Sequence, residues 1–385
     1  MNVSRYTDTT ELRFDVEFIT PTFLGGADGN AEIRTAPLKN LLRRWWRIAN
    51  GDLSPEELWK RESRLFGSTE KDPDIVEENK KLPKELRKPE IFGKSKVVLK
   101  IKESNCQISN RRELLFPNMI LNHPEVSRPV SVETYLGMGP VFWNKELKKT
   151  EYKNNYIVPS GKVSISLVIP REETEMFINI LSYINYFGTI GSRSRNGWGS
   201  IVISGLQNIS TKAEIILPAI SKISLIDWNT IYSKDEVKKY PYYFAKDEKG
   251  MLCWCTRPQK NWEEAMHIIA DTYLKVRTAF KFQKTEQKVL EPRHLLGYPV
   301  THHGVENWDI EKWKNGKTKK INTRLPSQLI LKVFKDNNSY YGLILHLPNQ
   351  IPLKGFSVES QKDIWKFVHG ALDHYGMERL TGATK

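Results

Sequence analysis

The chain of 385 residues carries 59 Lys and Arg against 45 Asp and Glu, which gives a formal net charge of +14. Its 39% of hydrophobic and 11% of aromatic residues are enough for folded cores and exclude a wholly disordered chain. No stretch approaches the ~18 consecutive apolar residues of a membrane-spanning helix, and 3 cysteines cannot frame a disulfide scaffold. Because the N-terminal residues are polar and contain no apolar signal segment, we expect a cytoplasmic protein.

The first half of the chain, residues 1–210, predicts strands that alternate with helices. Over 13–19, Phe14, Val16 and Phe18 fall on one face and charged residues on the other, which is typical of a strand with one exposed face. A glycine-rich turn at 25–30 then leads into a helix from about Pro37 to Asn50. Further strands are predicted at 97–101, 163–169 and 200–204, and a second helix at 176–187.

Two segments of the first half interrupt this pattern. The segment of about 69–92 is a dense run of charges with interspersed prolines and has no apolar period, so we expect a solvent-exposed insertion. The proline-containing segment 105–156 predicts loops and a hairpin.

The second half, residues 211–385, repeats the alternation without a visible sequence repeat. It predicts a long helix over 262–280, strands at 328–334 and 341–347 around a turn at 336–339, and a final helix over 364–375. Both halves therefore predict an α+β fold built from two units.

The positive charge suggests a polyanionic partner, most simply nucleic acid, and the predicted helix over 37–50 is its first concentration. At 100° per residue, Lys39, Arg43 and Arg47 share one side of this helix and Trp46 lies at its edge. No acidic residue occurs from Ile33 to Gly51. We expect this side to hold a phosphate backbone while Trp46 stacks on a base. The alternative is an ordinary solvated face whose Trp packs under a loop.

The second concentration is the segment 188–199, which we call the glycine loop. It contains Arg193 and Arg195 among four glycines, with Ser192 and Ser194 as further hydrogen-bond donors and no acidic residue. Glycine lets backbone N–H groups approach a ligand, so this composition favours a phosphate contact. The loop follows a helix and precedes a strand, which is the reverse of a dinucleotide fingerprint, and it lacks the Lys-Ser/Thr of a P-loop. The alternative is a tight connection in which glycine serves only the backbone geometry.

Signals for catalysis or metal binding are weak. Cys253 and Cys255 have no matching second pair for zinc, and His302 and His303 lie in a polar loop. No nucleophile elbow, metalloprotease motif or carboxylate cluster is present. We therefore expect no catalytic residue, no metal and no cofactor.

With these residues in view, the chain resembles RAMP proteins of CRISPR–Cas effector complexes, and in particular the first RAMP subunit of the type III-B (Cmr) complex. The glycine loop followed by a strand resembles the glycine-rich signature of that superfamily. The more specific match is carried by five N-terminal stretches: TPTFLGG at 20–26, RTAPLK at 34–39, LLR at 41–43, WWR at 45–47 and LFGS at 65–68. The segment 324–333 is similar to part of that subunit's second half.

The resemblance implies two ferredoxin-like domains with loop insertions, divided near residue 210. It also implies a non-catalytic subunit that holds the 3′ side of a guide RNA and its duplex with target RNA, beside other RAMP subunits. The expected RNA contacts are Arg34, Lys39, Arg43, Trp46, Arg47, Gly191, Ser192, Arg193, Ser194 and Arg195. Two alternatives stay open, a RAMP-type endoribonuclease that processes CRISPR precursor RNA and a protein-only assembly scaffold.

Overall fold

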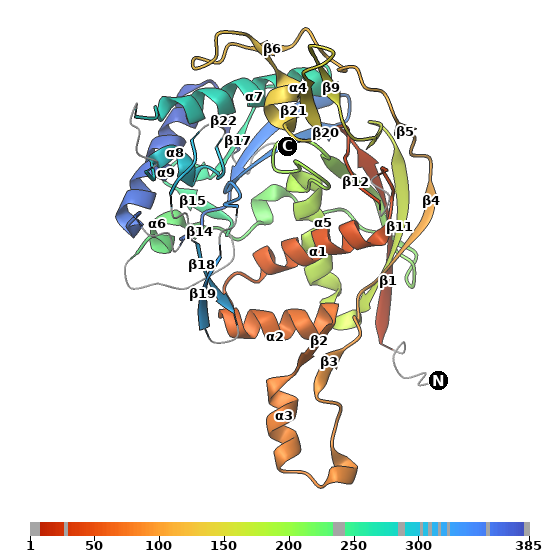
Figure 1. The fold of residues 1–385 in the computed structure, drawn as a ribbon. Helices are drawn as coiled ribbons and strands as arrows, with labels where there is room; N and C mark the ends of the chain where they lie inside the picture. Colours follow the sequence, from red (N-terminus) through yellow and green to blue (C-terminus); the bar gives the residue numbers. More distant parts are fainter. Residues whose placement is uncertain are drawn as a thin grey trace.

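The computed structural model describes residues 8–26, 30–233, 243–283, 289–300, 303–306, 310–314, 317–321, 324–351 and 355–380. The described residues mix helices with mostly antiparallel sheets, so the predicted α+β class is confirmed (Figure 1). Two sheets form the framework, one from each half of the chain, and the smaller elements are inserted between their strands.

The first sheet has the strand order β13-β12-β1-β11-β4, and all its pairs are antiparallel. Its strands are β1 (Thr9–Phe18), β4 (Val98–Ser104), β11 (Lys162–Pro170), β12 (Ile201–Asn208) and the short β13 (Ala213–Glu214). The alternation predicted for β1 is confirmed, because Phe14, Val16 and Phe18 are buried and Phe14 pairs with Ile165 on β11. The predicted strand at 200–204 is longer than expected and extends to Asn208.

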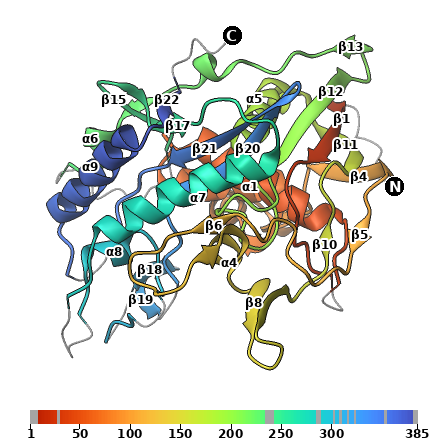
Figure 2. The same ribbon diagram turned by 90° about the horizontal axis from the view of Figure 1, so that it is seen from above.

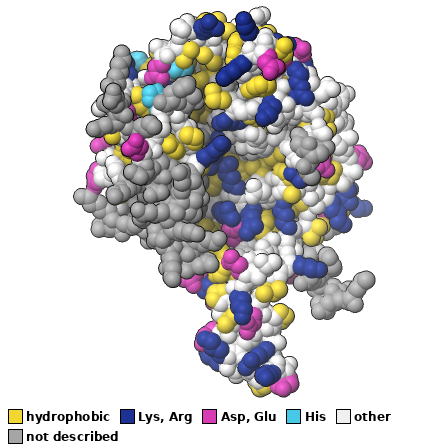
Figure 3. All heavy atoms as spheres, viewed as in Figure 1, with side chains coloured by type: hydrophobic (Ala, Val, Ile, Leu, Met, Phe, Trp, Pro, Cys, Tyr) yellow, Lys and Arg dark blue, Asp and Glu magenta, His cyan; other side chains and the backbone are white. Residues whose placement is uncertain are grey.

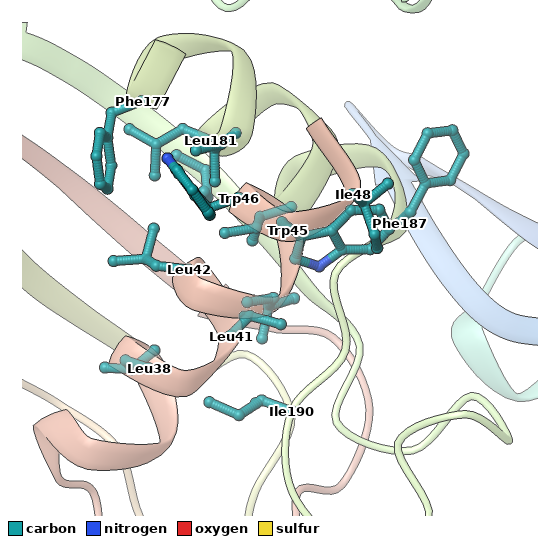
Figure 4. Packing of buried hydrophobic residues seen from close by; sticks show 14 of the residues in the cluster. Leu38, Leu41, Leu42, Trp45, Trp46, Ile48, Phe177, Leu181, Phe187 and Ile190 are labelled. Atoms are coloured by element: carbon teal, nitrogen blue, oxygen red, sulfur yellow. The ribbon is translucent and has the colours of Figure 1, made fainter. Parts of the chain in front are cut away.

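Two helices cover the buried face of this sheet. Helix α1 (Thr35–Ala49) follows β1, and helix α5 (Thr174–Phe187) connects β11 to β12. The helices pack against each other through the apolar residues that gave both segments their helical period (Figure 4). Chain order and sheet order together give a β-α-β-β-α-β unit in which β1 lies between β12 and β11.

The second sheet repeats this connectivity in the order β20-β21-β17-β22. Its strands are β17 (Cys253–Cys255), β20 (Leu329–Asp336), β21 (Ser339–His346) and β22 (Glu378–Arg379), and its helices are α7 (Trp262–Ala279) and α9 (Val358–His374). The predicted hairpin turn is confirmed between β20 and β21, where Asn337 has φ +51°. The predicted division near residue 210 falls between β12 and β13, within the strands of the first sheet, and stays a prediction as a domain boundary.

Strand β20 lies where the two halves meet, with helix α5 of the first half and helix α7 of the second packed against it (Figure 2). Alternate side chains of β20 enter different cores. Leu331 and Val333 belong to a core with α7, whereas Ile330 belongs to the core of β1, α1 and α5. The two halves are therefore packed against each other through β20.

The charged insertion is ordered, although we expected only an exposed segment there. Helix α2 (Pro55–Phe66) precedes it, and β2 (Ser68–Lys71) pairs with β3 (Ile91–Gly93) at its base. Between these strands lie α3 (Pro73–Lys80) and a 3-10 turn, η2 (Lys84–Leu86), so that 68–93 form an arm that projects from the body (Figure 1). We call this segment the α3 arm.

The remaining elements are short. In the first half they are β5 (Ile108–Ser109), β6 (Ile120–Leu121), β7 (Val130–Ser131), α4 (Val132–Gly137), β8 (Val141–Asn144), β9 (Lys149–Tyr152), β10 (Tyr156–Ile157) and η3 (Arg171–Glu173). The expected hairpin in 105–156 is confirmed as β8–β9. In the second half they are η4 (Ile220–Lys222), β14 (Ile226–Asp227), α6 (Trp228–Ile231), β15 (Ala245–Asp247), β16 (Gly250–Met251), α8 (Pro292–Leu295), β18 (Ile310–Lys314) and β19 (Lys317–Ile321). Among the described helices, none has the length and apolarity needed to cross a bilayer.

Candidate nucleic-acid interface

The glycine loop packs closely on the segment that follows β1. Ser192 N donates to Phe23 O at 2.9 Å and Gly199 N donates to Pro21 O at 3.1 Å. Gly191 has φ +94°, and a Cβ there would lie 2.7 Å from Phe23 O, so only glycine fits this approach. At least part of the glycine content therefore serves backbone geometry, as the alternative interpretation proposed.

The tip of the glycine loop nevertheless presents a cation to solvent. Arg193 is exposed and has a left-handed backbone, with φ +56°. Partial burial of its guanidinium and the nearby Arg324 charge lower the pKa of Arg193. No acidic side chain forms an ion pair with Arg193 or Arg324 among the residues that the structure describes. Ser192 is exposed beside Arg193 and Ser194 is half-buried, so the loop offers donors around a cation that has no acidic partner among the described residues.

Arg195 has a different role from Arg193. Its Nη1 donates to Ser327 O in the second half, and its own carbonyl accepts from Leu331 N at 2.8 Å. The guanidinium thus ties the glycine loop to the segment that leads into β20. The structure places Arg195 in a contact between the two halves, and its expected role as an RNA contact stays a prediction.

The basic side of α1 carries an acidic partner that the local sequence does not reveal. Glu62 on α2 is buried, and its carboxylate accepts hydrogen bonds from both Arg43 and Arg47, with 2.6 Å between Arg47 Nε and Oε2. The side chains of Arg43 and Arg47 keep exposed fractions of 35% and 44%. Two arginines therefore share one carboxylate, and the group keeps a net positive charge that can face a ligand.

Lys39 is the other cation of this side, one helical turn before Arg43. It is half-buried, and the burial together with the charge of Arg43 lowers the pKa of Lys39. In the part of the chain that the structure describes, no ion pair involves Lys39. A cation that is partly desolvated beside another cation gains free energy from a nearby anion.

Trp46 is a core residue, which corrects our expectation that it stacks on a base. Its side chain is 2% exposed and meets Phe66 edge to face, with ring centroids 6.0 Å apart. Figure 4 shows Trp46 among the apolar side chains of α1 and α5, near Phe177 and Leu181. Helix α2 contributes Phe66 to this core and thereby covers Trp46, which a helical projection of α1 alone places at the edge of the basic side.

Arg34 links the start of α1 to the same backbone that holds the glycine loop. Its Nη2 donates to Gly25 O at 2.6 Å, two residues beyond the Phe23 carbonyl that accepts from Ser192. Arg34 and the loop tip therefore lie at one short stretch, residues 23–25. Part of the turn after it, residues 27–29, lies outside the described residues.

No described interaction joins the basic side of α1 to the arginines of the glycine loop. At about 1.5 Å per residue, Arg43 and Arg47 lie about 13 and 20 Å along α1 from Arg34. On the face of the molecule that Figure 3 shows, Lys and Arg side chains form a band from the top, across the centre, to the base of the α3 arm. The arrangement suits an extended polyanion better than a compact one.

The weak catalytic signals have structural explanations. Burial raises the pKa of the Cys253 thiol well above its usual range and that of Cys255 to about 12, which leaves both as poor metal ligands at neutral pH. His303 stacks on Phe282 with ring centroids 3.7 Å apart, and His302 lies outside the described residues. Over the described ranges, no three His, Cys, Asp or Glu side chains form a cluster able to hold a metal ion.

Two residues of this region escaped the sequence interpretation. Arg324 lies beside Arg193 only because the halves pack together, although the segment it begins did resemble a family segment. Glu62 lies 15 residues beyond Arg47, on another helix, and no local pattern marks it. Both depend on contacts between elements, which a helical projection of one segment cannot contain.

Comparisons with known proteins agree with the sequence resemblance. Residues 15–202 match the model of the RAMP superfamily. The structure is similar to apo Cmr1 from Pyrococcus furiosus, with 14% identity, a TM-score of 0.47, and coverage of 94% of this chain and 96% of that one. No curated protein sequence matches the chain.

Two further solved structures are type III-B Cmr-beta complexes bound to cognate target RNA. In the first, the similar chain is 12% identical, with a TM-score of 0.41 and coverage of 95% of this chain and 100% of that one. The second also contains AMPPnP and was determined in the presence of ssDNA. Its similar chain is 13% identical, with a TM-score of 0.45 and coverage of 96% of this chain and 98% of that one.

Proposed function

We propose that this protein is a non-catalytic RNA-binding subunit of a type III-B CRISPR effector complex, where it holds the 3′ side of the guide RNA and its duplex with target RNA. Its partners are the guide RNA, the target RNA and neighbouring RAMP subunits. We base the proposed position of this protein within such a complex on the stretches between residues 20 and 68, which resemble the first RAMP subunit. We further propose that the two β-α-β-β-α-β units are ferredoxin-like domains and that the protein works in the cytoplasm.

One observation carries the RNA-binding part of this proposal. Arg193 and Lys39, on two elements of the same superfamily segment, are cations that no described acidic side chain neutralises. A phosphate backbone supplies evenly spaced negative charges to such sites without demanding a particular base. Arg34, Arg43, Arg47 and the backbone around Gly191 and Ser192 are then secondary contacts along the same path.

A binding and cleavage assay with labelled RNA tests the proposal. Purified protein is incubated with repeat RNA and with unrelated single-stranded RNA, with Mg²⁺ or with EDTA. We expect a mobility shift for both RNAs, no cleavage, and a log–log salt slope of about −0.7 per neutralised phosphate. Metal-dependent or metal-independent cleavage would assign the endoribonuclease role instead. If the protein neither binds nor cleaves RNA, the protein-only assembly scaffold is the interpretation that remains.

A matched pair of variants assigns the binding to this surface. Arg193→Gln removes the cation at the loop tip, which has no ion-pair partner among the described residues. Arg61→Gln removes an exposed arginine of α2 that is paired with Glu57 at 2.6 Å. We expect Arg193→Gln to weaken binding and flatten the salt slope, and Arg61→Gln to leave both as they are. Equal effects of the two variants would mean that only the overall charge matters.

A further inference from the structure

A buried lysine of the second half reaches both ends of the glycine loop. Lys332 on β20 is 1% exposed, and it is among the largest fully buried side chains of the described residues. Its Nζ donates to Ile201 O at 2.7 Å, to Ile184 O at 3.1 Å and to Asn185 O. The three hydrogens of the ammonium group are thus matched by three carbonyls.

The three carbonyls bracket the glycine loop. Ile184 and Asn185 lie in the last turn of α5, just before the loop, and Ile201 is the first residue of β12, just after it. The last carbonyls of a helix have no partner within the helix, and a positive charge there is favourable. Lys332 therefore fixes the distance between the two ends from which the loop projects.

Neighbouring residues of β20 bind at two more points, one in the glycine loop and one at the residue that follows it. Leu331 N donates to Arg195 O at 2.8 Å, and Val333 N donates to Ser200 Oγ at 2.9 Å. The backbone of β20 thus follows the second part of the glycine loop, while the Lys332 side chain lies under its ends. The glycine loop is therefore held from both halves of the chain, by residues 21–23 of the first half and by β20 of the second.

We propose that Lys332 is a positioning residue for RNA binding, which it supports by holding the ends of the glycine loop from the second half. This inference rests on the proposed RNA-binding role of the loop. Burial lowers the pKa of the Lys332 ammonium well below its usual range, whereas the three carbonyl acceptors favour the protonated form that donates to all of them. Lys332 itself touches no RNA, because it is buried.

Lys332→Met and Lys335→Met in the full chain form a matched pair. Both lysines lie on β20 and reach the first half, but Lys335 pairs with Glu17 on β1 at 2.6 Å and makes no described hydrogen bond to either end of the glycine loop. Hydrogen exchange of the loop amides of Ser192, Asn196 and Gly199, all hydrogen-bonded, reports the loop without any RNA. We expect Lys332→Met to speed their exchange about tenfold more than that of α9 amides, and Lys335→Met to change both equally.

RNA affinity then tests whether the loop transmits this effect. We expect Lys332→Met to weaken binding on the order of tenfold in the wild-type background, because three carbonyls lose their hydrogen bond from Lys332. In an Arg193→Gln background we expect the same substitution to weaken binding less than about twofold. If Lys332→Met does not fold, the same affinities are measured with Lys332→Gln, which keeps one donor group, in the wild-type and the Arg193→Gln backgrounds.

Two results would overturn the inference: loop exchange that rises no more than that of α9, or affinity losses that simply add in the double variant. Absence of RNA binding by the wild-type protein would overturn the proposed function instead, while the exchange measurement still decides whether Lys332 holds the loop.

Discussion

Replacing Trp46 by Ala distinguishes a core residue from a base-stacking residue. The side chain is 2% exposed and lies against Phe66 and the α5 side chains. Burial of this kind predicts a loss of about 3–5 kcal/mol in the free energy of unfolding, because the site cannot collapse around the removed ring. We expect denaturant titration to show this loss, and the folded protein to bind RNA within about twofold of the wild-type affinity.

Trp46→Phe is the matched control. The buried Nε1 of Trp46 has no hydrogen-bond partner among the described residues, so its removal costs no hydrogen bond. Phe keeps most of the apolar contact, and we expect a change within about 1.5 kcal/mol. Our assignment would be refuted if Trp46→Ala kept the stability of the wild type and instead lost about 1–3 kcal/mol of RNA binding, the usual contribution of a stacked base.

Three further predictions concern charge. Glu62→Gln should lower the free energy of unfolding by about 1–3 kcal/mol, since Arg43 and Arg47 lose a charged acceptor; an unchanged denaturation midpoint would contradict this. Arg193→Gln should reduce the salt slope by about 0.7 and leave stability within about 0.5 kcal/mol; a large stability loss with an unchanged slope would assign it a packing role. Burial lowers the pKa of His369 to about 3. As the pH falls below ~6.5, His369 therefore takes up a proton in the unfolded chain but not in the folded chain. The contribution of His369 to the free energy of unfolding is fully present above that pH and falls by about 2 kcal/mol by pH 5. His369→Gln should shrink the difference between unfolding at pH 7.5 and pH 5, and an identical difference would exclude this contribution.

The elements that sequence periodicity predicts well are those whose burial repeats along the chain. Strand β1 alternates because one of its faces is buried by α1 and α5, and the hairpin β20–β21 is marked by polar turn residues between two apolar runs. Helix α3 was missed because it has almost no buried side chain. It is capped by Asp72, which pairs with Arg64 from α2, so its stability comes from contacts outside its own segment.

The candidate site was predictable to a smaller extent, for a related reason. Composition identified the glycine loop and the basic side of α1, and Arg193 and Lys39 do lie there without described counter-charges. The assignment of Trp46 was wrong because the side chain contacts Phe66 on α2, and the contact of Arg195 with Ser327 before β20 was not foreseen. A helical projection gives the direction of a side chain and says nothing of which neighbour covers that direction.

The shared position of β20 has a consequence for how the protein is made. Helix α5 and strand β12 leave the ribosome early, but β20 begins at Leu329, about 120 residues after β12 ends at Asn208. At about 5–20 residues per second, the N-terminal half waits roughly 6–24 s for the strand that carries Ile330 into its core. During that interval an apolar surface stays uncovered on a nascent chain. Production of this protein should therefore depend on chaperones that act on ribosome-bound chains, and a gene truncated after codon 210 should yield aggregates.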